Sequence, residues 1–246
     1  MYVIGDIGNT ETKVCLFNKK KLLKKEILNT KNIKNYNIND NLKFIKFYQK
    51  KIKKIVFCSV VPNVFTNIKR SIKKKYKLEV KELKQYNLKK LLKIDVNMKQ
   101  VGSDRLANAI SVINNKDNFI ILDFGTATTF DVVLKNRYKG GIIAPGVNLS
   151  LRTLVEKAKL IPHTKLTKIK NIVGKNTQSA VRSGFYWGYQ GLIKNIINLI
   201  KRKNKKNFKI IFTGGLSHLY KDTLKNKIKI DRDLTIKGLL RLIDLI

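Results

Sequence analysis

The chain has 246 residues and a formal net charge of +37 at pH 7, with only 8 arginines among its 53 basic residues. Its 43% hydrophobic residues allow a buried core, which excludes a disordered basic tail, and the shortage of arginine argues against a dedicated nucleic-acid partner. No apolar run approaches the roughly 20 residues that span a membrane, and the opening residues do not resemble a signal peptide, so we expect a cytoplasmic protein with no membrane partner.

The first half of the chain alternates between predicted strands and helices. Short apolar runs bounded by turn residues predict a strand followed by a hairpin, and a later buried strand that Pro62 ends. After a lysine-rich connection, Leu106, Ala109, Ile110 and Ile113 recur at helical spacing. The predicted strands are residues 2–4, 13–17, 22–28 and 55–61, and the predicted helices are residues 42–54 and a segment that begins near Gly102.

The second half repeats the opening pattern. An apolar strand leads into D-x-G-[NT] and then into a hairpin twice, at Asp6 and at Asp123, 117 residues apart. This repeat predicts two similar α/β domains that face each other across a cleft, residues 1–114 and residues 115–246. The second half is expected to contain strands at 119–122, 129–134 and 209–212, a strand returning into Gly140, and helices after Gly146, at 176–203 and at 234–246.

The segment at residues 6–10, of sequence DIGNT, has the composition of a phosphate-binding hairpin. A glycine at a strand end lets backbone N–H groups approach a phosphate that a Cβ atom would hold off. Asp6 would repel that phosphate unless a divalent cation lay between them, so it indicates Mg²⁺ held through water. Thr10 and Lys13 suit terminal phosphate oxygens. The alternative is a tight turn in which Asp6 caps backbone amides, but the repeat at Asp123 favours a nucleotide.

Asp104 is the third carboxylate of interest. It lies in the segment at residues 102–105, of sequence GSDR, at a predicted helix start. An ordinary helix-capping aspartate is one explanation. The other is catalytic, because an alcohol that accepts a phosphoryl group needs a carboxylate to take its proton, and Asp104 beside Arg105 suits that task.

Three other segments carry weaker signals. Gly174-Lys175-Asn176-Thr177 is not a P-loop, because the glycine required five residues earlier is Ile169, so it predicts a helix start with Thr177 available to a ligand. Thr213-Gly214-Gly215 follows a strand and either approaches a nucleotide base or forms a strand-to-helix turn. Cys15 and Cys58 belong to no Cys/His cluster and are expected to be buried as small hydrophobic residues, without a disulfide or zinc.

Taken together, these motifs resemble type III pantothenate kinase, a family of the actin, hexokinase and Hsp70-like ATPase superfamily. The resemblance implies two duplicated ribonuclease H-like (actin-like ATPase) domains around a central cleft. It covers residues 3–239 and departs from the family pattern at residues 95–99, in the segment expected to cover the substrate. The matching segments, in family order, are DIGNT at 6–10 with Lys13, SVVP at 59–62, GSDR at 102–105, DFGTATT at 123–129, GGIIAPG at 140–146, GKNT at 174–177, TGG at 213–215 and LTIKGL at 234–239.

The resemblance also implies an activity: ATP-dependent phosphorylation of pantothenate at its primary hydroxyl, the first step of coenzyme A biosynthesis. Asp104 would be the proton acceptor, Asp6 would hold Mg²⁺ through water, and Asp123 would bind a monovalent cation, K⁺ or NH₄⁺. Thr126 would contact ATP, and Thr177 would reach pantothenate across a homodimer interface. The ATP loop would comprise Asp6, Ile7, Gly8, Asn9, Thr10, Glu11, Thr12 and Lys13, and the pantothenate site Gly102, Ser103, Asp104, Arg105 and Thr177.

Two alternatives stay open at this point. One is a non-catalytic regulatory or nucleic-acid-associated homologue on the same fold, against which the intact set Asp6, Asp104 and Asp123 argues. The other is a sugar kinase of the same superfamily, although the branch with a zinc-binding Cys/His cluster is excluded by the two cysteines.

Overall fold

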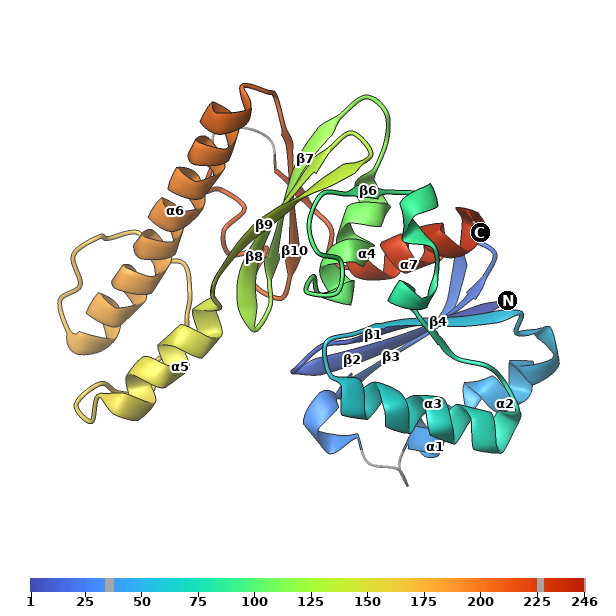
Figure 1. Ribbon diagram of the computed structural model, residues 1–246. Helices are drawn as coiled ribbons and strands as arrows, with labels where there is room; N and C mark the ends of the chain where they lie inside the picture. The colour runs from blue at the N-terminus through green and yellow to red at the C-terminus, as the bar shows by residue number, and fades with distance from the viewer. Residues whose placement is uncertain (34–37, 225–227, 246) are drawn as a thin grey trace. The chain divides into compact units, whose positions relative to one another are not determined.

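The computed structural model describes residues 1–33, 38–224 and 228–245, which form two compact units (Figure 1). Unit 1 contains Met1–Ile113 together with Asp233–Ile246, and unit 2 contains Asn114–Arg232. The predicted second domain, residues 115–246, includes the final segment, whereas the structure places this segment, from Asp233 on, in unit 1. The physical reason is that its helix packs against a helix of unit 1. Within the described residues, no helix is both long enough and apolar enough to cross a membrane.

Unit 1 is built on a sheet with the strand order β3-β2-β1-β4-β5. β1, β2 and β3 form an antiparallel meander, and β4 and β5 continue the sheet parallel to β1. The predicted opening strand, hairpin and fourth strand are therefore confirmed. The strands are β1 (Tyr2–Ile7), β2 (Glu11–Asn18), β3 (Lys21–Asn29), β4 (Lys54–Ser59) and β5 (Lys81–Glu82).

Helices cover both faces of this sheet (Figure 1). Val3 and Ile7 of β1 belong to one buried cluster with Ile68 and Ile72 of α3, so these side chains point to the α3 face. Successive side chains of a strand alternate between faces, and Asp6 therefore points to the other face, which α4 and α7 cover. The helices are α1 (Ile38–Asn41), α2 (Phe44–Tyr48) and α3 (Pro62–Tyr76) on one side, and α4 (Ser103–Val112) and α7 (Leu234–Leu245) on the other.

Two predictions for unit 1 were wrong. The expected helix at 42–54 is only the short α2 and a 3-10 turn, because β4 already begins at Lys54. Residues 62–76 were predicted to be the end of a strand and part of a lysine-rich connection, but they form α3. Pro62 lies in the first turn of this helix, where a backbone N–H would have no hydrogen-bond partner within the helix, so its absence does not destabilise the helix. The remaining short elements of unit 1 are 3-10 turns at Thr30–Asn32, Gln49–Lys51, Leu83–Gln85 and Leu88–Lys90, and β6 (Lys93–Ile94).

α7 packs closely on α4. A Cβ atom at Gly238 would overlap the carbonyl oxygen of Ala107, so the two helix backbones approach at this point as only glycine allows. Thr235 donates its hydroxyl to Asn108 Oδ1 at 2.9 Å. The Arg241 guanidinium donates to the carbonyl oxygen of Ile113 at 2.6 Å, satisfying the end of α4. The C-terminal helix thus fixes the helix that carries Asp104.

Unit 2 repeats the topology of unit 1. Its strands run in the order β11-β10-β7-β8-β9, with β7, β8 and β9 antiparallel and β10 and β11 parallel to β7. This is the same order and direction as β5-β4-β1-β2-β3, which confirms the predicted duplication. The strands are β7 (Asn118–Phe124), β8 (Ala127–Leu134), β9 (Arg137–Pro145), β10 (Lys209–Gly214) and β11 (Lys229–Ile230).

The long helix α6 (Thr177–Asn204) packs on one face of the second sheet, and α5 (Val147–Lys157) follows β9. Ile120 and Leu122 of β7 share a buried cluster with Ile193 and Ile197 of α6. By alternation along β7, Asp123 points to the opposite face. Asp6 and Asp123 therefore occupy equivalent places. Each lies near the carboxyl end of the first strand of its unit, on the face of the sheet opposite the helix that packs on it, α3 in unit 1 and α6 in unit 2.

Candidate active site

The turn between β1 and β2 is fixed by hydrogen bonds from its own backbone and from Thr30. The Gly8 N–H donates to the carbonyl oxygen of Glu11 at 2.9 Å. The Thr30 hydroxyl donates to the carbonyl oxygen of Gly8 at 2.7 Å, and the Thr30 N–H donates to that of Thr10 at 2.9 Å. Asn9, Thr10 and Glu11 are exposed at the tip. The predicted phosphate loop is thus a preformed turn whose polar tip faces solvent.

Two residues predicted in the ATP loop have buried side chains. Ile7 is part of the core, and the Thr12 hydroxyl lies 2.9 Å from the Thr30 hydroxyl inside the protein. Any contact of these two residues with a ligand would have to come from their main chains. Thr30 was not singled out by the sequence, because only the fold brings it beside the turn.

Asp6 lies in a row of three side chains across the sheet. Its register partners are Lys13 on β2 and Cys58 on β4. The buried Cys58 thiol donates to Asp6 Oδ1 at 3.3 Å. Burial and the charge of Asp104 raise the pKa of Asp6 to about 6, against the opposing influence of the thiol and Lys13. Cys58 is buried as expected, but it also holds the Asp6 carboxylate, which no local sequence signal indicated.

Asp104 is the second residue of α4, and Gly102 rather than Asp104 is the N-cap of that helix. Its Oδ1 accepts the N–H of Arg105 at 2.8 Å. Burial raises the pKa of the Asp104 carboxyl, while this hydrogen bond and the Arg105 and Lys84 charges act in the opposite direction. A Cβ atom at Gly102 would collide with the Asp104 carboxylate. Glycine therefore leaves the space in which the carboxylate sits, and Ser103 beside it is buried.

The arrangement of Asp6 and Asp104 is suited to a divalent cation and a phosphate. The two carboxylates are close enough for the charge of Asp104 to raise the pKa of Asp6, and a cation near them would relieve that repulsion. Among the described residues, no group of three or more Asp, Glu, His or Cys side chains forms a protein-only metal site. Mg²⁺ in phosphoryl-transfer sites needs only one or two carboxylates, since phosphates and water supply its other ligands. Asp6 therefore fits the predicted role.

Replacing Asp6 by Asn should stabilise the unliganded protein at neutral pH. The folded pKa of Asp6, about 6, exceeds its ordinary value of 3.8, so between these values the folded state binds more protons than the unfolded state. Stability is then lost as the pH rises through this window. We expect Asp6→Asn to raise the free energy of unfolding by about 1 kcal/mol near pH 7.5, after allowance for solvent screening of a half-buried group, and by little near pH 4.

Chemical denaturation of both proteins at the two pH values measures this effect. Asp222→Asn is the matched control, because Asp222 is an exposed carboxylate whose pKa is lowered by its hydrogen bond to Lys168. The control should gain no stability as the pH rises. If Asp6→Asn raised the free energy of unfolding by the same amount at both pH values, the predicted titration of Asp6 would be contradicted.

In unit 2, Asp123 lies near the carboxyl end of β7, and the turn at Gly125 and Thr126 follows it. The Gly125 N–H donates to the carbonyl oxygen of Ala127 at 3.1 Å, as Gly8 does to Glu11 in unit 1. Thr126 is exposed, and a Cβ atom at Gly146, the N-cap of α5, would overlap the Thr126 carbonyl. The helix start thus packs directly against the backbone of the second turn and fixes its position.

Thr177 is the first residue of α6 and is exposed. Asn176 is the N-cap, and it exchanges hydrogen bonds with Ser179 in a capping box. The predicted helix start is confirmed, with the Thr177 side chain available at the surface.

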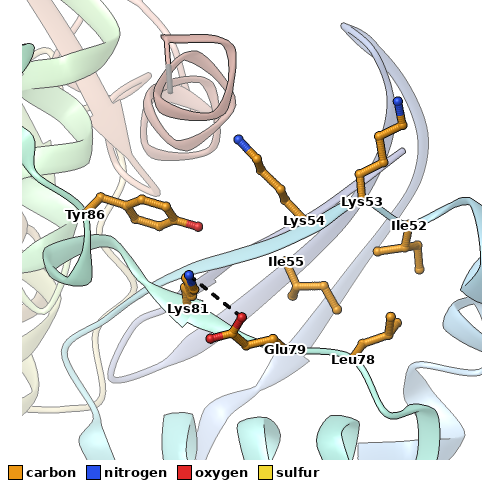
Figure 2. A pocket seen from close by; sticks show the side chains of 8 residues that line it. All are labelled: Ile52, Lys53, Lys54, Ile55, Leu78, Glu79, Lys81 and Tyr86. Atoms are coloured by element: carbon orange, nitrogen blue, oxygen red, sulfur yellow. Dashed lines mark ion pairs between the residues drawn. The ribbon is translucent and has the colours of Figure 1, made fainter.

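A cavity of about 230 Å³ lies elsewhere in unit 1 (Figure 2). It opens at the amino ends of β4 and β5, where Lys81 faces Glu79 at 3.8 Å. Asp6 and Cys58 are at the opposite, carboxyl ends of their strands, which is where open α/β sheets bind ligands. The cavity contains none of the predicted site residues. Its lining residues are Ile52, Lys53, Lys54, Ile55, Leu78, Glu79, Lys81 and Tyr86.

Solved structures share this duplicated fold at low sequence identity. A Campylobacter jejuni protein with the provisional description of a conserved Baf family transcriptional activator has a TM-score of 0.64 and 21% identity, covering 99% of this chain and 98% of that chain. An inorganic polyphosphate/ATP-glucomannokinase from Arthrobacter sp. strain KM has a TM-score of 0.51 and 12% identity, covering 99% and 98%. The paired sheets with their aspartate-bearing hairpins define a protein of the actin-like ATPase fold, the class that includes sugar kinases.

Sequence comparison identifies the family within this fold class. The family model described as type III pantothenate kinase matches residues 2–199. A type III pantothenate kinase of Pelagibacter ubique (strain HTCC1062) is 58% identical over 247 residues, covering all of both chains, and one from Sulfurihydrogenibium sp. (strain YO3AOP1) is 39% identical, covering 97% and 98%. The chain belongs to the type III pantothenate kinase family.

Proposed function

We propose that this protein transfers the γ-phosphoryl group of ATP to the primary hydroxyl of pantothenate, giving 4′-phosphopantothenate and ADP in the first step of coenzyme A biosynthesis. Family membership supports the substrate pair. The observation that carries the chemistry is the Asp6 and Asp104 pair: a half-buried carboxylate of raised pKa at the start of α4, within electrostatic reach of a carboxylate beside the phosphate turn.

In this proposal Asp104 accepts the hydroxyl proton as the oxygen forms its bond to the γ-phosphorus and the bond to the β-phosphate oxygen breaks. Its raised pKa improves it as a base, because a base acts best when its pKa approaches the working pH. Lys13 and Arg105 stabilise negative charge on the transferring group. Bound Mg²⁺ supplies further stabilisation of that charge. The turn at residues 8–11 presents backbone and polar groups to the phosphates.

The remaining assignments follow the family resemblance. Residues 102–105 and Thr177 hold pantothenate, the latter across a homodimer interface, and Thr126 contacts ATP. Asp123 binds a monovalent cation, K⁺ or NH₄⁺. A cytoplasmic location agrees with the two free, buried cysteines, since disulfides are rare in that compartment.

A coupled assay of ADP release tests the proposal. We expect turnover with ATP and pantothenate in potassium or ammonium buffers, and nearly none with a panel of sugars, with no acceptor, or in sodium or lithium buffers. Turnover with a sugar would indicate a sugar kinase instead. Absence of turnover with every acceptor would favour a non-catalytic regulator. Full activity and an unchanged cation response in Asp123→Ala would contradict only the cation assignment.

A further inference from the structure

The two sheets place an aspartate at the same position but surround it differently. In unit 1, Asp6 is flanked by Lys13 on β2 and Cys58 on β4. In unit 2, Asp123 is flanked by Thr129 on β8 and Thr213 on β10. Because β1, β2 and β4 correspond to β7, β8 and β10 in order and direction, the residue that replaces Lys13 is Thr129. Unit 1 therefore supplies an ammonium group beside its aspartate, and unit 2 supplies a hydroxyl at that position.

The Thr129 hydroxyl is placed for a ligand at Asp123. Directly paired residues on adjacent strands point to the same face, so Thr129 and Asp123 lie side by side. Thr129 Oγ1 is buried and has no hydrogen-bond partner among the residues that the structure describes. A buried hydroxyl without a partner costs free energy, which a bound cation would recover.

The backbone of β10 also leaves room at the Asp123 carboxylate. Gly214 has φ +83°, a conformation that side chains other than glycine rarely adopt, and a Cβ atom there would lie 2.6 Å from Asp123 Oδ1. Gly214 therefore allows this backbone conformation and leaves space beside Asp123 Oδ1.

We propose that the Thr129 hydroxyl is a ligand of the monovalent cation at Asp123, and that this cation balances in unit 2 the carboxylate charge that Lys13 balances in unit 1. The inference rests on the cation role of Asp123 in the proposed function. A carboxylate and a hydroxyl are oxygen donors suited to K⁺, and both also accept hydrogen bonds from NH₄⁺, which accounts for a site that takes either ion.

Binding of Tl⁺, a spectroscopic substitute for K⁺, tests the inference without an activity readout. The full-length protein with Mg·ADP is titrated with Tl⁺ and followed by ²⁰⁵Tl NMR. We expect Thr129→Val, which keeps the shape and removes the oxygen, to weaken Tl⁺ binding by roughly tenfold or more. Thr129→Ser should retain most of the affinity. Thr129→Lys, which restores the arrangement of unit 1, should abolish Tl⁺ binding.

Thr128→Val is the matched control. Thr128 is the adjacent residue of β8, its buried hydroxyl likewise has no partner among the described residues, and its side chain points to the other face of the strand. The control should bind Tl⁺ as the wild type does. Tl⁺ affinity unchanged in Thr129→Val, but lost in Asp123→Ala, would overturn the role of Thr129 while leaving the cation site intact. Unchanged affinity in Asp123→Ala would instead reject the cation site itself.

Discussion

Asp104→Asn should lower kcat by ~10² or more while ATP binding is retained. The amide keeps the size of the side chain but cannot take the proton of the acceptor hydroxyl. The hydrogen bond that Asp104 Oδ1 accepts from the Arg105 N–H at 2.8 Å can be made equally well by an amide oxygen, so the start of α4 should keep its structure. Steady-state kinetics with pantothenate, and calorimetric titration with Mg·ATP, measure the two quantities separately.

Two further variants test whether the loss of kcat depends on the Asp104 carboxylate and on its position. Asp40→Asn applies the same chemical change to an exposed carboxylate of unit 1 and should leave kcat unchanged. Gly102→Ala would force the Asp104 carboxylate out of the space that it occupies, because the added Cβ collides with the flexible end of that side chain rather than with backbone. It should therefore lower kcat with little loss of stability. Near-normal turnover in Asp104→Asn would reject Asp104 as the base.

Local patterns were enough to predict much of this architecture. The hairpins after Asp6 and Asp123 follow from short apolar runs separated by turn residues, and their repetition indicated the duplicated topology that the two sheets have. The missed helix α3 shows the limit of such patterns. Phe65, Ile68, Ile72 and Tyr76 do recur at helical spacing along its buried side, but the lysines of its exposed face and Pro62 at its start favoured a connecting segment instead.

The surroundings of the candidate catalytic groups could not be predicted in the same way. Cys58 is 52 residues from Asp6 in sequence, and the parallel pairing of β1 and β4 is what brings the thiol within 3.3 Å of the carboxylate. The effect of Asp104 on the pKa of Asp6 likewise depends on α4 lying over the same face of the sheet. Residue type and motif indicated which carboxylates are candidates for the site, whereas strand register and helix packing determine which residues surround them.

The position of α4, and with it Asp104, depends on its contact with α7, and Gly238→Ala should disrupt that contact. A Cβ atom at Gly238 would overlap the backbone carbonyl of Ala107, so α4 and α7 would have to move apart. Overpacking of this kind costs about 2 kcal/mol or more, which exceeds the gain of about 1 kcal/mol that alanine normally brings to a helix. We expect a net loss of stability of about 1 kcal/mol or more, which corresponds to a fall in Tm of at least roughly 2–4 °C.

Thermal unfolding followed by circular dichroism measures this loss, and Gly188→Ala separates it from the general effect of removing a glycine. Gly188 lies within α6, and a Cβ atom there would meet nothing within 4 Å. The control should therefore gain about 0.5–1 kcal/mol, the opposite sign from Gly238→Ala. Equal stabilisation by both substitutions would mean that α7 does not pack on α4 at the backbone distance described. A fall in Tm confined to Gly238→Ala would establish that the C-terminal helix supports the element carrying the proposed base.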